Sequence, residues 1–179
     1  SGPSGSDRNE LRAGDIRMRF REAEGRAVFD RLHAEGSVRW LSGDTRANAP
    51  KRREPARTLE ASSLEMVFSG DGGSLEEGIA AGRVTVSEEK EIAGRRSQIS
   101  RLLADSMQFH FFPGDNRIRD LEASGRVQAV YEKAGGGEER PGAGRLLASS
   151  ERMRILFALE NGESVVASAS QWGDRKSVV

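Results

Sequence analysis

The sequence predicts an all-β fold, a twisted β-sandwich built from about four tandem hairpin repeats. Three observations support this: a similar stretch recurs four times along the 179 residues, apolar and polar residues alternate within each copy, and turn-forming residues follow each alternating run. Alternation with a period of two is typical of strands with one buried face, whereas a helix needs apolar residues three and four positions apart.

The first half of each repeat is centred on an alanine. These alanines are Ala13, Ala61, Ala104 and Ala148, with periods of 48, 43 and 44 residues. Each alanine follows a leucine by two positions. Apolar residues also stand five and seven positions after it, namely Met18 and Phe20, Met66 and Phe68, Phe109 and Phe111, and Met153 and Ile155. Such agreement between four copies indicates one structural unit used repeatedly.

The apolar pattern changes phase inside this first half. The leucine and alanine share one phase of the strand, and the later apolar residues occupy the other, so a regular strand would place them on opposite faces. Small polar pairs such as Ser62-Ser63 and Asp105-Ser106 lie at the change of phase. We therefore predict a bulge or sharp bend that returns the apolar residues to the same side.

The second half of each repeat reads Ala-x-Gly-x-Val. The three clear copies are Ala34 to Val38, Ala80 to Val84 and Ala123 to Val127, and the fourth degenerates to a glycine-free run over 164–169. The repeated glycine falls in the inward phase, where a missing side chain leaves room for a bend or a close crossing.

These halves define the expected organisation. We expect a disordered segment over 1–8 and one domain over 9–179, with repeats at about 11–41, 59–86, 102–131 and 146–169. Turn chemistry, such as Asn161-Gly162, joins the halves. The links 42–58, 87–101 and 132–144 are charged or rich in glycine and proline. Because they recur at the same point of the repeat, we expect them to project from the same region of the fold, and we expect the third to be mobile. A single hairpin cannot bury its apolar face, so the repeats should stack around a continuous interior.

The complete repeat pattern resembles the OstA-like repeat of lipopolysaccharide-transport proteins. It consists of Leu-x-Ala, then alternating Met or Phe, and then Ala-x-Gly-x-Val. The resemblance covers residues from about Leu11 to Ala169, although Ser37, Arg83 and Arg126 stand where that family has Asn after the glycine. It implies a V-shaped β-jellyroll of the kind found in LptA, LptC and the N-terminal domain of LptD. It further implies a periplasmic location, an apolar groove that shields acyl chains, and neighbouring modules that join end to end by strand pairing. The chain begins with Ser rather than Met, which is compatible with a removed leader or membrane anchor.

The candidate lipid-binding residues are the inward-phase apolar side chains of these strands. They are Met18, Phe20, Val38, Trp40, Leu64, Met66, Phe68, Val84, Met107, Phe109, Phe111, Val127, Met153 and Ile155. Ordinary core packing is the alternative explanation for the same pattern. Methionine and phenylalanine at one depth in every repeat would also suit a deformable acyl-chain lining, and the resemblance favours that interpretation.

Composition and motifs argue against several other functions. The 28 basic and 28 acidic residues give no net charge, so nucleic-acid binding is not expected. The chain has no cysteine for disulfides or thiolate metal sites, and no apolar run of membrane-spanning length. We expect no metal or other cofactor and no enzymatic activity, because neither histidine, His33 or His110, has partners at ligand spacing and no catalytic motif is present. We expect both histidines to lie at the surface.

Two further interpretations stay open. The basic stretch Lys51-Arg52-Arg53, with Arg46 and Arg57 nearby, is either a solvated loop, which we favour, or a contact for lipid phosphates. The protein as a whole could instead be a filled structural module that forms homo-oligomers or docks partners through exposed edge strands. The truncated fourth repeat, ending near Ala169, would leave such an edge.

Overall fold

The computed structural model describes residues 8–43, 56–92, 95–133, 145–160, 163–173 and 176–178. This part of the chain is all β, with no helix and therefore none that could span a membrane. The strands are β1 (Arg8–Arg12), β2 (Asp15–Ala23), β3 (Arg26–Gly43), β4 (Ala56–Phe68), β5 (Leu75–Ile92), β6 (Arg95–Phe111), β7 (Ile118–Lys133), β8 (Arg145–Glu160), β9 (Glu163–Trp172) and β10 (Lys176–Val178).

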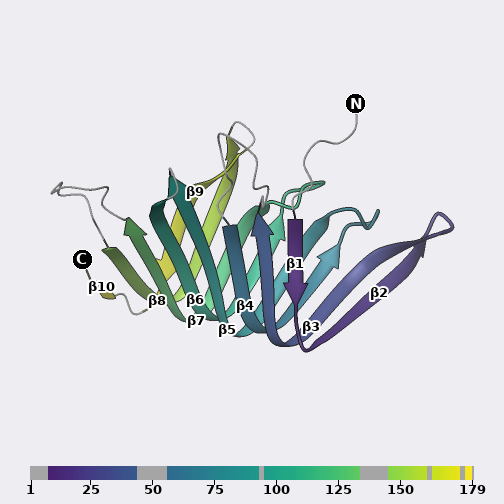
Figure 1. Ribbon diagram of the computed structural model, residues 1–179, viewed down its shortest axis with the longest axis horizontal. Coiled ribbons are helices and arrows are strands. Elements are labelled where there is room, and N and C mark those ends of the chain that lie inside the picture. Colours follow the sequence, from purple (N-terminus) through teal and green to yellow (C-terminus); the bar gives the residue numbers. More distant parts are fainter. Residues whose placement is uncertain are drawn as a thin grey trace.

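All ten strands belong to one antiparallel sheet, in which β3 to β8 lie side by side in chain order. Strands β3 to β8 are long and each bends once, so the sheet folds over into two layers that join along a crease (Figure 1). We call layer 1 the part with β1 and β10, and layer 2 the part with β2 and β9. Both β1 and β2 pair with β3, on opposite sides of the crease, and β10 and β9 pair with β8 in the same way.

The crease is formed by a glycine and the residue after it. Gly36-Ser37 in β3, Gly82-Arg83 in β5 and Gly125-Arg126 in β7 all have positive φ angles, between 49° and 79°. Left-handed backbone of this kind is open to glycine but costs other residues of order 1–3 kcal/mol. At each of these sites the two residues lie opposite a single residue of a neighbouring strand. Gly36 and Ser37 of β3, for example, lie opposite Ser62 of β4 alone. The result is a β-bulge that turns the strand.

The predicted change of phase occurs at this crease. In β4, Ala61 and Leu64 are both buried although they stand three positions apart, and Ala104 and Met107 of β6 behave in the same way. The bend thus returns the apolar residues of β4 and β6 to one side, as the sequence pattern indicates. The extra residue itself lies in the glycine-containing strands, and the small polar residue of β4 or β6 faces it.

Several expected boundaries differ from the strands of the structure. Arg8, assigned to a disordered segment, already belongs to β1. Much of the link over 87–101 is strand, because β5 continues to Ile92 and β6 begins at Arg95, with backbone pairing that needs no apolar side chains. The ends of the links expected over 42–58 and 132–144 are strand at 42–43, 56–58 and 132–133, and the rest of both links lies outside the described residues.

The fourth repeat also continues beyond the boundary expected near Ala169. Strand β9 extends to Trp172, Gly173 has a φ of 91°, and β10 then pairs with β8 on the far side of the crease. Gly173 faces Glu151 of β8, just as Gly82 faces Ser62 of β4. Gly173 is therefore the crease glycine that the sequence pattern missed, because no Ala-x-Gly-x-Val motif surrounds it.

The core lies between the two layers and consists of a single cluster that draws buried residues from both. Layer 1 contributes Val38, Leu59, Ala61, Val84, Leu102, Ala104 and Val127, and layer 2 contributes Ala34, Leu64, Met66, Leu75, Ala80, Met107, Phe109, Phe111, Leu121, Ala123 and Met153. The crease brings these faces together, since an unbent sheet of this pattern would leave them exposed to water.

Replacing Gly82 with alanine should test the crease directly. A Cβ at this position would lie 2.5 Å from Ser62 Oγ and 2.6 Å from Ser62 Cβ, on a backbone with φ of 79°. We expect Gly82→Ala to lower the free energy of unfolding by about 1–3 kcal/mol in urea titrations. The matched control is Gly70→Ala in the β4–β5 turn, where φ is not positive and the nearest atom is Arg21 Nη2 at 3.4 Å. Equal unfolding midpoints for the two variants would contradict this account of the bend.

Candidate apolar binding face

The inward face of the folded sheet contains all the candidate lipid-binding residues, but their exposure to water differs. Nearly complete burial is found for Val38, Leu64, Met66, Val84, Met107, Phe109, Phe111, Val127 and Met153. Trp40, Phe68 and Ile155 are half-buried and pack against this cluster. The middle of the interior is therefore closed by the protein's own side chains.

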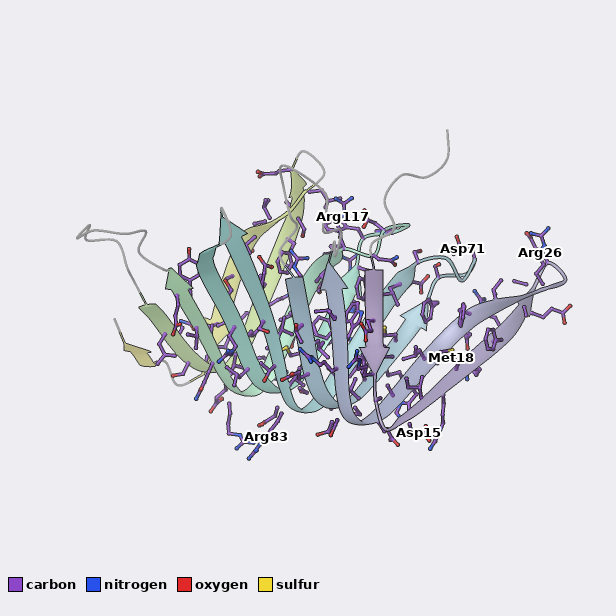
Figure 2. The ribbon with its side chains drawn as sticks, in the orientation of Figure 1. Asp15, Met18, Arg26, Asp71, Arg83 and Arg117 are labelled. Atoms are coloured by element: carbon purple, nitrogen blue, oxygen red, sulfur yellow. The ribbon has the colours of Figure 1, made fainter. Side chains whose placement is uncertain are left out.

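Met18 and Phe20 do not fit the expectation of a water-free interior, because each keeps 52% of its surface exposed. Both lie on β2, which pairs with β3 alone among the described strands. The β2–β3 hairpin extends away from the rest of the sheet, and Figure 2 places Met18 on it. With no further strand beyond β2 in the described part of the chain, few described side chains can cover these residues.

Ile16 and Phe29 belong to the same exposed group, although they were not among the candidates. Ile16 lies opposite the buried Ala34, and Phe29 lies opposite Phe20, so both point toward the inward face. Their exposures are 41% and 39%. The repeat itself contains the signal, since Leu64 and Met107 stand at the position equivalent to Ile16, three residues after the alanine.

Three phenylalanines form a row across the end of layer 2 that carries the hairpin. The ring centroids of Phe20 and Phe29 are 4.8 Å apart, and those of Phe29 and Phe68 are 5.6 Å apart, both in tilted arrangements. Such spacing is favourable for aromatic pairs. Because Phe68 packs against the core cluster, the row is continuous with the buried interior.

The rim turns of layer 2 are linked by hydrogen bonds. Arg21 Nη2 donates to the backbone oxygen of Ser69 over 3.1 Å, which ties β2 to the turn that follows Phe68. The backbone N–H of Leu75 donates to Asn116 Oδ1 over 2.9 Å, which ties that turn to the next one. Hydrogen bonds from Ser69 and from the N–H of Gly73 hold the pKa of Asp71 below its ordinary value. These links fix the turns beside the aromatic row.

The outer face of layer 2 carries charges, the most buried of which belongs to Asp120. Its carboxylate lies 2.8 Å from His110 Nδ1, 3.1 Å from Arg119 Nε and 3.8 Å from Arg154 Nη2. Burial raises the pKa of Asp120, but the hydrogen bonds and electrostatic interactions with His110 and Arg119 together outweigh it, so the pKa lies below its ordinary value. His110 thus lies on the outward side of its strand, as expected, in a structural ion cluster.

A shallow depression of about 390 Å³ lies at the crease and is lined by Ser37, Val38, Arg39, Glu60, Ala61, Ser62, Gly82 and Arg83. No group of three or more His, Cys, Asp or Glu side chains suited to a metal ion occurs in the described part of the chain. Arg46 and Lys51-Arg52-Arg53 lie outside that part, whereas Arg57 Nε contacts Glu88 Oε2 at 2.9 Å.

Replacing Asp120 with asparagine should reveal the pH dependence of this ion cluster. Because the pKa is lowered by folding, the carboxylate stabilises the fold above the unfolded pKa of about 3.9, and this stabilisation is lost as pH falls through the folded value. We expect Asp120→Asn to cost about 1–3 kcal/mol at pH 7, with the difference from the wild type vanishing in acid. Unfolding titrations at several pH values measure this. Glu122→Gln, which removes an exposed pair with Arg152, is the control and should change little; a pH-independent effect of Asp120→Asn would contradict the assignment.

Comparison with protein-family models, curated proteins and solved structures finds no match to this chain. The apolar inward face, its exposed end and the charges around it therefore provide the basis for a functional proposal.

Proposed function

We propose that the protein is a non-enzymatic lipid-binding and bridging module of the OstA-like jellyroll type, which holds acyl chains of lipopolysaccharide or a related lipid against the inward face of its sheet. In this proposal it works in the periplasm, between two membranes. The observation that carries the proposal is an inward face that is predominantly apolar in all the long strands and is still exposed at one end, where Ile16, Met18, Phe20 and Phe29 lie.

The driving force for binding would be hydrophobic. Each acyl methylene removed from water contributes about 0.8 kcal/mol to binding, so a chain of several methylenes needs no polar contact with the protein to stay bound. The lipid's sugars and phosphates would remain in water outside the layers. An equilibrium binding face cannot impose direction on transport, so an energised membrane partner would have to supply it.

Bridging would use the two edges of the sheet. Among the described strands, β1 and β2 each pair only with β3, and β9 and β10 each pair only with β8, so backbone groups at both ends of the sheet are available for another strand. Exposed edges of this kind favour strand addition by a partner. We propose that similar modules, including further copies of this chain or other components of the transport system, join here and extend the apolar face.

A second candidate function is an assembly module that binds no lipid. It is favoured by the closed middle of the interior, where Met107 and Phe109 are each only 1% exposed. In that case the inward face would be an ordinary core, and the edges alone would carry function.

Lipid binding by the purified protein separates the two candidates. We expect a fluorescent lipid A analogue to bind, with affinity reduced about tenfold or more by Phe68→Glu, which places a charge on the inward face at the end of the aromatic row. The matched control is Ile79→Glu, because Ile79 is an exposed apolar residue on the outer face of the sheet. Circular dichroism verifies that both variants fold. Absence of binding by the wild type, or equal loss in both variants, would favour the assembly module.

A further inference from the structure

We propose that the site open to lipid is confined to the β2–β3 end of the sheet, and that it accepts a single anionic alkyl amphiphile. The tail would lie on the platform formed by Ile16, Met18, Phe20, Phe29 and Phe68, and the head would lie beside Arg21 at the rim. This inference rests on the proposed lipid-binding function and narrows it to one place and one class of ligand.

The platform is one continuous apolar surface. Met18 lies opposite Leu32 and Ile16 opposite Ala34, while the ring contacts join Phe20 and Phe29 to Phe68. From Ile16 to Phe20 the strand advances about 13 Å at roughly 3.3 Å per residue. This surface is long and narrow, as an extended alkyl chain is.

The chemistry of the platform selects an alkyl chain over a peptide. None of its five side chains carries a nitrogen or oxygen atom. A peptide lying on this face would leave its backbone polar groups without partners, which is costly in an apolar environment, whereas an alkyl chain has no such groups. The free backbone groups of β2 point along the sheet and not out of its face, so strand addition at the edge would not occupy the platform.

Arg21 provides charge complementarity for the head. Its hydrogen bond to the Ser69 oxygen holds the guanidinium at the turn immediately after Phe68, at one end of the aromatic row. Its Nε lies 3.9 Å from Asp30, which has a closer partner in Arg19. Asp71 is also near, but its carboxylate is bonded within its own turn to Ser69 and Gly73. The donors of Arg21 that these contacts leave unused can bind a carboxylate or phosphate.

The other parts of the inward face offer an alkyl chain less accessible apolar surface. In the middle, Leu64, Val84, Met107, Phe109 and Val127 are at most 1% exposed, so a chain could enter only if the layers separated.

At the opposite end, Val166 of β9 is 61% exposed and lies opposite Phe157, and Leu159 of β8 is 41% exposed, but Ser164 and Ala169 of β9 lie on that face as well and no aromatic ring pair is found there among the described residues. Small and polar side chains give an alkyl chain little apolar area to contact. The two open ends of the sheet are therefore unequal.

Binding of a dansyl-labelled single-chain fatty acid to paired variants tests this asymmetry. Phe20→Glu and Val166→Glu place the same charge on the inward face at opposite ends, at positions that are both more than half exposed. Circular dichroism verifies that both variants fold. We expect one fatty acid per protein, an affinity lowered about tenfold or more by Phe20→Glu, and a change of less than about twofold with Val166→Glu. Phe20→Leu should retain binding.

Arg21→Gln tests the head position. It should lower the affinity for the fatty acid several-fold and leave the affinity for dodecyl maltoside, which has a neutral head, unchanged. Displacement of the dansyl probe measures the second affinity. Equal effects of Phe20→Glu and Val166→Glu, or several fatty acids per chain, would overturn the proposed site while lipid binding itself stands. If the wild type binds neither the fatty acid nor a lipid A analogue, the proposed function fails as well.

Discussion

The left-handed backbone at the crease is the constraint on which the rest of the structure depends. A glycine with positive φ is common in turns, but here the following residue, Ser37, Arg83 or Arg126, adopts the same region at a cost of order 1–3 kcal/mol. Local contacts offset part of this cost: Ser62 Oγ donates to the backbone oxygen of Gly82, and Arg126 forms an ion pair with Asp105. The larger compensation comes from the interior, since the bend lets two apolar faces cover each other.

Folding one sheet over itself gives an interior whose coverage varies along the crease. Central strands have neighbours on both sides and a facing layer, so Met107 and Val127 are sealed from water. At the ends each strand has one neighbour among the described strands, and the same inward residue type is left exposed, as for Met18. The middle therefore stabilises the fold, and in the proposed function the end supplies the accessible apolar surface.

The sequence predicted the elements that depend on local pattern. Alternation identified the strands, and the change of phase between Ala61 and Leu64 correctly indicated the bend, because the inward face must stay apolar on both sides of it. Gly173 was missed since its crease role depends on pairing with β8 and not on a motif around it. The strand ends near Ile92 and Arg95 were missed for a similar reason, as backbone pairing there is accompanied by charged residues.

Exposure of the candidate site could not be predicted from the repeat. Met18 and Met66 stand at the same position in their repeats, yet Met66 is 6% exposed and Met18 is 52% exposed. Of their two strands, only that of Met66 has a neighbour on each side among the described strands. Position within the sheet, which a repeat pattern does not contain, therefore decides which inward residues can meet a ligand.

The four methionines provide the most direct measurement, since each repeat places one on the inward face. Methionine oxidation by hydrogen peroxide follows exposure of the sulfur and can be quantified for each residue by peptide mass spectrometry. A folded sheet closed in its middle and open at the β2–β3 end predicts rapid oxidation of Met18 and slow oxidation of Met66, Met107 and Met153. Similar rates at all four methionines, or protection of Met18 with rapid oxidation of Met107, would contradict the shared interior on which the account depends.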